Sequence, residues 1–390
     1  MSLNPFKSDF MSRPQVKPSH CKKYLDMGSE DYRIPTFILS HSEGVKNVKF
    51  SPDASLLLSC STDGKVYLWN ARVGQLNYCL LTHLGAVRSC AFSPKDGRFV
   101  ASCGDDRCIK LWDVKNYSKV TTLKGHTQVV WDINFSPGGT FIVSSSSDKS
   151  AKVWDTRDSK FVMSLDAHTE PVIYSKFSPD GRYICTCSWD KTLRIWDLQT
   201  RKTLHVLKGH DDWISHCSFS PKGNVLASSS HDCTVRLWNC KDGTEIALLQ
   251  DHTSDVNMCL FSPNGQLLAS ASSDKTVRIF EIQGTRTAKS TLDDKHTQSH
   301  ELRGHQESVS AISFSQDGNF LVSASDDGTL RVYDAHQMQL FEILGGHSDR
   351  VVACDISPQG HLIASASKDG NVLLWDISRA QHTSRTCSIS

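Results

Sequence analysis

The stretch GHTQVVWDINFSPGGTFIVSSSSDKSAKVWD, residues 125–155, contains the whole pattern that decides the fold. It begins with Gly125 and His126, and Trp154 follows His126 after 28 residues. Between them lie two short apolar segments, a Ser-Pro-Gly-Gly turn at 136–139 and a second turn at Asp148. Short apolar segments bounded by Gly, Pro and Asp turns are typical of β-strands, and no stretch of the chain shows a sustained 3.6-residue apolar period.

The same spacing recurs eight times along the 390-residue chain. Each histidine precedes an aromatic residue by 28 positions, except in the second unit, where the longer turn Ser93-Pro94-Lys95-Asp96-Gly97 makes the spacing 29. The units are centred on residues 41–69, 83–112, 126–154, 168–196, 210–238, 252–280, 305–333 and 347–375. Successive histidines are 42 or 43 residues apart except between His252 and His305, where a polar insertion, 283–300, is predicted to be a loop. A fixed period of about 40 residues indicates a repeat architecture.

Each unit supplies three short strands and a fourth before the next histidine, and so small a sheet cannot bury both of its faces alone. Stacking the sheets radially buries those faces, and closing the ring protects the strand edges. Residues 1–31 mix Pro, Lys and Ser with few apolar positions, and residues 378–390 are polar. We expect both segments to be disordered, on either side of one domain at 32–377.

The pairs Gly125-His126 and Trp154-Asp155, with the turn at 136–139 between them, resemble the WD40 repeat family. The resemblance extends from Tyr32 to Ile377. It implies an all-β fold: a single closed eight-bladed β-propeller of four-stranded antiparallel blades. It also implies closure by an N-terminal strand, Pro35 to Leu39, that pairs with the last blade.

The composition of the chain disfavours several classes of function. Lys and Arg total 43 against 42 for Asp and Glu, so a net charge of +1 disfavours binding to nucleic acid. The 14 cysteines are scattered, and Cys185 and Cys187 have no second pair at a zinc-ligand spacing. We expect reduced thiols in a cytoplasmic or nuclear protein with no cofactor or metal. The first ten residues lack the apolar stretch of a signal peptide and no run of 18 apolar residues occurs, so we expect a protein that is neither secreted by a signal peptide nor membrane-spanning.

Every unit carries a hydroxyl residue ten positions and an aspartate six positions before its aromatic residue, as in Ser144 and Asp148 before Trp154. The resemblance implies a structural network in which the indole N–H donates to the hydroxyl, and His126 joins the hydroxyl to the aspartate. Eight equivalent copies favour architecture over catalysis, because a catalytic triad needs one activated nucleophile facing a cavity. Phe280 and Tyr333 replace the tryptophan in units six and seven, which predicts weaker networks there and the greatest mobility around the insertion. The hydroxyl residues are Ser59, Ser102, Ser144, Thr186, Ser228, Ser270, Ser323 and Ser365, and the aspartates are Asp63, Asp106, Asp148, Asp190, Asp232, Asp274, Asp327 and Asp369.

The resemblance places a binding face on the side of the ring that carries the histidine and aspartate loops. Its variable positions are the third and fifth residues after each histidine and the residue just before each aspartate. In units three to five these positions are apolar or aromatic: Val129, Trp131, Pro171, Ile173, Trp189, Trp213 and His231. In units eight, one and two they include Arg350, Lys368, Lys46 and Arg88, and Asp105, Asp255 and Asp326 lie among them or on the remaining units.

Exposed tryptophans are common anchors of interfaces, so this face predicts a protein or peptide partner with an apolar anchor followed by acidic or phosphorylated residues. Capping of the seams between blades and ordinary solvated charges are the alternatives. We therefore expect a non-catalytic interaction scaffold, a monomeric propeller within a larger complex.

Two motifs suggest other roles. Trp154-Asp155-Thr156-Arg157, preceded by the run Ile142 to Ser147, resembles the box with which substrate receptors of cullin-RING ubiquitin ligases dock their adaptor, and Trp69-Asn70-Ala71-Arg72 is a poorer copy. The C-terminal Cys387-Ser388-Ile389-Ser390 resembles a prenylation box, which would bring the protein to membranes if Cys387 is modified. A solvated arginine in a turn and an unmodified tail are the simpler interpretations.

Overall fold

The structure, a computed structural model, describes residues 32–81, 83–282 and 299–378. The predicted disordered segment 1–31, most of the polar insertion and the tail with Cys387 lie outside the described residues. Ser299 and His300, which the sequence places in the insertion, are instead the first residues of a strand. The same ranges contain no helix of the length and hydropathy needed to cross a bilayer.

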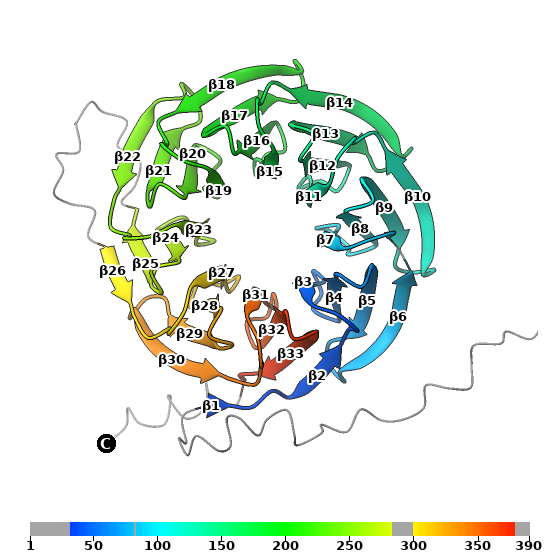
Figure 1. Ribbon diagram of the computed structural model, residues 1–390, viewed down its shortest axis with the longest axis vertical. Coiled ribbons are helices and arrows are strands. Elements are labelled where there is room, and N and C mark those ends of the chain that lie inside the picture. The colour runs from blue at the N-terminus through cyan, green and yellow to red at the C-terminus, as the bar shows by residue number, and fades with distance from the viewer. Residues whose placement is uncertain (1–31, 82, 283–298, 379–390) are drawn as a thin grey trace, which may run out of the picture.

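Eight β-sheets form a closed ring around a common axis (Figure 1). The first strands of blades one to eight are β3 (Val45–Phe50), β7 (Val87–Phe92), β11 (Val130–Phe135), β15 (Val172–Phe177), β19 (Ile214–Phe219), β23 (Val256–Phe261), β27 (Val309–Phe314) and β31 (Val351–Ile356). The second strands are β4 (Leu56–Ser61), β8 (Phe99–Gly104), β12 (Phe141–Ser146), β16 (Tyr183–Ser188), β20 (Val225–Ser230), β24 (Leu267–Ser272), β28 (Phe320–Ser325) and β32 (Leu362–Ser367).

The third strands are β5 (Lys65–Asn70), β9 (Cys108–Asp113), β13 (Ser150–Asp155), β17 (Thr192–Asp197), β21 (Val235–Asn239), β25 (Val277–Glu281), β29 (Leu330–Asp334) and β33 (Asn371–Asp376). The outer strands of blades one to seven are β6 (Gln75–Leu81), β10 (Ser118–Lys124), β14 (Lys160–Asp166), β18 (Lys202–Lys208), β22 (Glu245–Leu249), β26 (Ser299–Leu302) and β30 (Gln339–Leu344). Two N-terminal strands, β1 (Tyr32–Arg33) and β2 (Phe37–Ser40), complete the ring. The predicted all-β eight-bladed propeller is therefore confirmed.

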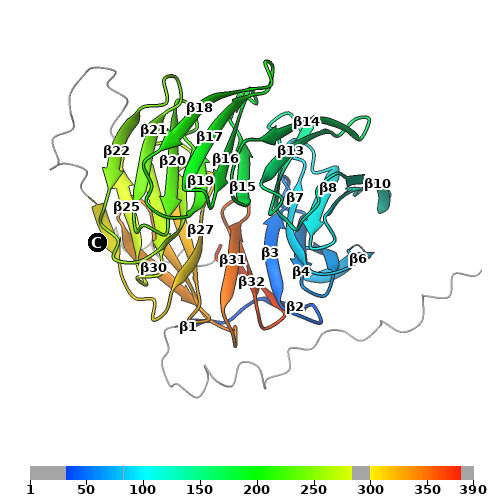
Figure 2. The same ribbon diagram turned by 45° about the horizontal axis from the view of Figure 1, so that its top comes forward.

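Within a blade the strands run antiparallel in sequence order, with the first strand nearest the axis and the last at the rim (Figure 1). The tilted view shows innermost strands such as β3, β31 and β15 facing the centre (Figure 2). In every blade the histidine precedes the first strand and the aspartate lies in the turn between the second and third strands, so both loops lie on the same side of the ring.

The core consists of separate apolar layers between neighbouring blades. One layer packs Ile109 and Leu111 of blade two against Ile133, Ile142 and Trp154 of blade three, all of them buried. Equivalent layers join the other neighbours, so each blade buries both faces only by sharing them. This is the arrangement that the size of the repeat predicts.

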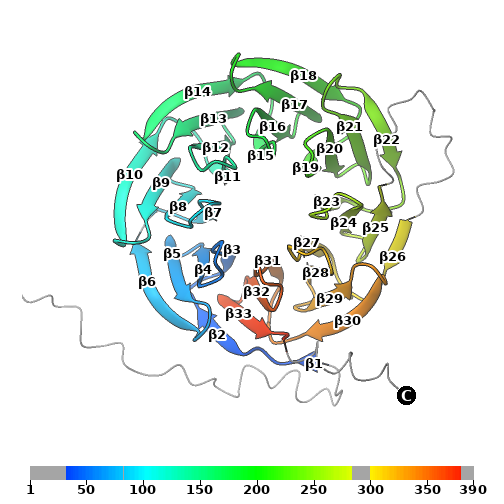
Figure 3. The same ribbon diagram turned by 180° about the vertical axis from the view of Figure 1, so that it is seen from behind.

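The N-terminal strand closes the ring as predicted. Strand β2 pairs antiparallel with β33, from Phe37 opposite Leu374 to Ser40 opposite Asn371 (Figure 3). Leu39 is buried in the layer between blades eight and one. The eighth blade thus takes its outer strand from the opposite end of the sequence.

One element departs from the expectation of four strands in every blade. Strand β1 pairs parallel with the outer edge of β30, which gives blade seven a fifth strand. Arg33 Nη1 donates to both carboxylate oxygens of Glu342, at 3.1 and 3.0 Å, and Arg33 Nη2 donates to the carbonyl of Asp376. The segment before β2 therefore fastens blade seven to blade eight across the seam.

Candidate functional site

The loops on one side of the ring are held by buried polar networks. In blade three, His126 Nε2 lies 2.8 Å from Ser144 Oγ, His126 Nδ1 lies 2.8 Å from Asp148, and Trp154 Nε1 donates to Ser144 Oγ at 3.0 Å. All eight hydroxyl residues are 0% exposed, so no substrate can reach them in this conformation. The repeated hydroxyl, histidine and aspartate thus form buried hydrogen-bonded networks beneath the loops.

The networks are less uniform than the sequence suggests. The bond from the indole to the hydroxyl is formed by Trp69, Trp154, Trp196 and Trp238. Within the described residues Trp112 Nε1 and Tyr333 Oη are buried without a hydrogen-bond partner, and Trp375 Nε1 donates to the carbonyl of Arg33 at 3.3 Å. In blade one His41 Nδ1 is 3.4 Å from Asp63. Phe280 and Tyr333 predicted incomplete networks in blades six and seven. The structure shows that blades one, two and eight also lack one of these hydrogen bonds.

The aspartates of these networks are held in their charged form. Burial alone would raise the pKa of Asp106, but the hydrogen bond from His83 and the charge of that ring lower it to about 2. Burial opposes the same kind of hydrogen bond at Asp148 and Asp232, whose pKa values are also lowered. The charged carboxylate in turn accepts the backbone N–H at the start of the loop, as from Thr127 to Asp148 at 3.0 Å.

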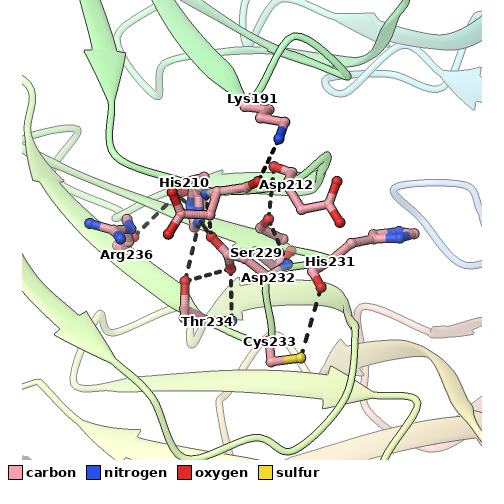
Figure 4. A network of polar contacts seen from close by, with 12 residues as sticks. Lys191, His210, Asp212, Ser229, His231, Asp232, Cys233, Thr234 and Arg236 are labelled. Atoms are coloured by element: carbon pink, nitrogen blue, oxygen red, sulfur yellow. Dashed lines mark hydrogen bonds and ion pairs between the residues drawn. The ribbon is translucent and has the colours of Figure 1, made fainter.

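Figure 4 shows how blade five holds its histidine and aspartate loops. His210 Nδ1 lies 2.7 Å from Asp232, which also accepts hydrogen bonds from Thr234. Lys191 of blade four donates to the carbonyl of Asp211 at 2.6 Å and so joins the two blades. The loops of blade five are consequently held both by the histidine network of their own blade and by Lys191 of blade four.

A β-bulge aims one side chain of each blade at this face. In all eight blades the pairing between the first and second strands skips one residue, which is the fifth after the histidine. Lys46, Arg88, Trp131 and Ile173 are such residues. Bulges turn a side chain out of the regular sheet pattern, which explains why this position can vary without disturbing the blade.

A backbone hydrogen bond places the other two variable positions side by side. The residue before each aspartate donates its N–H to the carbonyl of the third residue after the histidine, as from Trp189 to Pro171 at 3.0 Å and from His231 to Trp213 at 2.9 Å. Every blade has this bond. The three variable positions thus form one small surface per blade.

Blades four and five carry the aromatic part of this face. The rings of Trp189 and Trp213 stack with centroids 4.6 Å apart at 15°, and His231 lies 5.8 Å from Trp213. Trp213 is 42% exposed. Val129, Pro171 and Ile173 are half-buried.

Trp131, which is half-buried like Trp189, makes different contacts. Its Nε1 donates to Ser147 Oγ at 2.7 Å, and the guanidinium of Arg88 lies over its ring at 4.8 Å from the centroid. Of the three tryptophans at the variable positions, Trp189 and Trp213 stack with each other.

The predicted basic arc is partly neutralised. Arg88 makes two hydrogen bonds to Asp105, at 2.6 and 2.9 Å, and Arg350 pairs with Asp326 at 3.4 Å. Among the described carboxylates none is close enough to pair with Lys46 or Lys368. Burial and the positive charges of Arg88 and Lys368 lower the pKa of Lys46. Asp255 pairs with His231 at 3.5 Å on the aromatic side.

The possible adaptor box is only partly accessible. Trp154 and Thr156 are buried, whereas the side chain of Arg157 is 68% exposed and its Nε donates to Asp155 at 3.0 Å. Of the predicted docking residues, Asp155 and Arg157 alone reach the surface, and they pair with each other. In the poorer copy, Arg72 is also exposed.

The sequence reasoning missed a cavity of about 690 Å³ lined by the inner strands. Its polar residues include Lys49, which pairs with Asp355 at 3.1 Å, and Asp132, which accepts from Ser89 Oγ at 2.8 Å. Burial raises the pKa of Asp132 to about 6 and, with the charge of Lys176, lowers that of His216 to about 3. Residues at the sixth and eighth positions after each histidine, such as Asp132 and Lys49, differ between the repeats, and this variation could have indicated the polar cavity.

A family model described as "WD domain, G-beta repeat" matches the chain eight times, at residues 33–70, 74–113, 117–155, 159–197, 201–239, 243–281, 296–334 and 338–376. Each match combines the outer strand of one blade with three strands of the next. The repeats of the sequence therefore straddle the blades of the structure.

Curated relatives match over short regions. The nuclear distribution protein nudF of Aspergillus flavus is 37% identical over 100 residues, 25% of this chain and 22% of that protein. Polyadenylation factor subunit 2 of Candida albicans is 29% identical over 122 residues, 31% of this chain and 22% of that protein. The matched regions thus span less than a quarter of these relatives.

A solved structure matches nearly the whole ring. The computationally designed Ika8 protein superposes with a TM-score of 0.76 and 26% identity, covering 89% of this chain and 100% of that protein.

Proposed function

Because the chain belongs to the WD40 repeat family, we propose that it is a non-catalytic scaffold that binds protein or peptide partners on the face carrying its histidine and aspartate loops. WD40 propellers typically act as interaction platforms, and the two relatives bear the names of a distribution protein and a factor subunit. Their names fit a role inside a cytoplasmic or nuclear assembly.

The observation that carries the proposal is the stack of the half-buried Trp189 on the exposed Trp213, on the same face as two lysines without a carboxylate partner, Lys46 and Lys368. The anchored loops hold the tryptophans in place before binding, which lowers the entropy lost on association. A large aromatic surface beside half-buried apolar residues is a common interface anchor.

The charge distribution indicates the class of partner. Since Arg88 and Arg350 already have carboxylate partners, Lys46 and Lys368 are the cations that an incoming anion can use. We therefore propose an extended partner segment with an apolar or aromatic anchor at one end and aspartate, glutamate or phosphorylated residues at the other.

Quantitative affinity purification of the tagged chain tests the face. The test variants are Trp213→Ala and the double change Lys46→Glu with Lys368→Glu. The control for the first is Leu204→Ala, which is 41% exposed on the outer strand β18 of blade four. The control for the second is Lys119→Glu with Lys241→Glu, exposed lysines on β10 and in the turn between β21 and β22.

Both test variants should lose the same partners by at least about tenfold, and both controls should keep them. Unchanged recovery by Trp213→Ala and by the double lysine variant would remove the basis for this face. Recovery of a ligase adaptor that depends on Arg157 would instead support a role as a ubiquitin-ligase substrate receptor.

A further inference from the structure

Three buried thiols meet between blades four and five. Cys185 and Cys187 belong to β16 and Cys217 belongs to β19, and their Sγ atoms all lie within 4.8 Å of one another. All three residues are 0% exposed. The rest of their layer is apolar and includes Leu193, Ile214 and Trp238.

The geometry of the sheet brings the thiols together. Residues two apart on a strand point to the same face, so Cys185 and Cys187 both face the next blade, while Thr186 between them binds His168. Cys217 packs onto that face from the innermost strand of blade five. The sequence alone did not show this third sulfur, because it lies 30 residues beyond Cys187.

The repeats provide an internal comparison. Cys90, Cys259 and Cys354 occupy the position of Cys217 in blades two, six and eight. At the positions of Cys185 and Cys187, the strand facing Cys259 carries Ala227 and Ser229. The triple cluster is therefore an addition to the repeat pattern and not one of its requirements.

We propose that Cys185, Cys187 and Cys217 form a three-sulfur binding site for Cu(I). Thiolates are soft ligands that favour Cu(I) and Zn(II) over hard cations. With metal–sulfur bonds of about 2.3 Å, three sulfurs around one ion are about 4 Å apart, so the cluster needs to contract by less than an ångström. Structural Zn(II) normally takes four ligands, and the described residues supply three here.

The charges around the cluster suit a bound cation. Three thiolates in an apolar layer would be costly without compensation. Lys176 faces Cys185 across the strand pair, and among the described residues it forms no ion pair. The ion and Lys176 together offset two of the three negative charges.

Because the thiols are closed off from solvent, the ion has to enter while the blades assemble. The full chain is therefore produced in cells grown with added copper and, separately, with added zinc, and is purified without oxygen in the presence of a competing chelator. Metal per chain is measured by mass spectrometry, and the number of sulfur neighbours by X-ray absorption at the copper edge.

The wild-type chain should retain one Cu(I) bound by three sulfurs. Cys185→Ala and Cys217→Ser should each lower the retained copper by at least about tenfold. Cys185→Ala introduces the residue that blades two, five, six and eight carry at this position, Ala101, Ala227, Ala269 and Ala364, so it is compatible with folding. The controls Cys90→Ser and Cys259→Ser should retain copper as the wild type does.

A wild-type chain that keeps no copper, or a folded Cys185→Ala chain that keeps as much as the wild type, overturns the site. Equal loss in Cys90→Ser does so as well, because it would place the copper at another group of thiols. Retention of Zn(II) in preference to Cu(I) would refute the assignment of the ion.

Discussion

The hydroxyl at the centre of each histidine network decides how well a blade satisfies its buried polar groups. Ser144 Oγ accepts from Trp154 Nε1 and contacts His126 Nε2, so the donor of the indole is used. Trp112 occupies the same place in blade two, but its Nε1 is buried without a partner. The same residue type therefore contributes differently in two blades.

We expect Trp154→Phe to lower the free energy of unfolding by about 1 kcal/mol more than Trp112→Phe. Both changes remove the same atoms, but only the first breaks a hydrogen bond, while the second also removes an unsatisfied donor. Urea unfolding followed by circular dichroism measures the difference. Equal losses in the two variants would contradict it.

Asp132 contributes to the free energy of unfolding in a pH-dependent way, and the sign of its contribution is opposite to that of the aspartates in the histidine networks. Burial raises its pKa to about 6, above the unfolded value of about 4, so folding favours the protonated form. This contribution is complete below about pH 4 and is lost as the pH rises through 6. Asp132→Asn should therefore be more stable than the wild type by a margin that grows between about pH 5 and 7, to about 1–3 kcal/mol.

The measurement is the difference in urea midpoint between variant and wild type across that range. The difference is used because the lowered pKa of His216 makes stability rise with pH in both proteins, and this trend cancels when the two are compared. Asp251→Asn, the same change at an exposed aspartate, is the control. A constant difference for Asp132→Asn as well would mean that this carboxyl is not perturbed.

At the scale of the strand, the short β1 acts through a few specific contacts. Arg33 binds the carboxylate of Glu342 in blade seven and the carbonyl of Asp376 in blade eight, and its own carbonyl accepts from Trp375. The Arg33→Ala change keeps the backbone pairing and removes the side-chain contacts. Its effect should therefore be local to the seam.

Hydrogen exchange should become up to about tenfold faster in β1, β2 and β33 of the Arg33→Ala variant, corresponding to about 1 kcal/mol for a partly exposed ion pair. Strands β15 to β18, on the other side of the ring, should not change. Arg182→Ala removes a pair with Asp197 inside blade four and is the control. Faster exchange throughout the ring would show that β1 stabilises more than the seam.

Strands β1 and β2 differ in how well they could be predicted from the sequence. The repeat spacing predicted the blades, because they depend on a local pattern that recurs eight times, and the resemblance to the family implied the role of β2. Strand β1 could not be predicted, since it is two residues long and depends on Glu342 and Asp376, more than 300 residues away. The positions of the variable face were predicted from the resemblance, but the pairing of Arg88 with Asp105 and the stack of Trp189 on Trp213 depend on how neighbouring blades meet.

At the scale of the whole molecule, six blades are continuous in sequence, blade seven gains β1 from the N-terminal segment, and blade eight takes its outer strand β2 from the same segment. A chain that begins at His41 lacks β1 and β2, so β33 becomes an open edge and the layer between blades eight and one loses Leu39. Losing this apolar burial should lower stability on the order of 3–5 kcal/mol. The open edge should also promote self-association, because unpaired strand edges add further strands.

Thermal unfolding and light scattering compare that chain with one that begins at Tyr32, which keeps both strands and should behave as the full chain does. A synthetic peptide of residues 32–42 should restore the melting temperature and the monomeric mass of the shorter chain by adding to the edge of β33. A scrambled peptide should do neither. If the chain from His41 is as stable and monomeric as the chain from Tyr32, the pairing of β2 with β33 contributes little and the ring is held by its inter-blade layers alone.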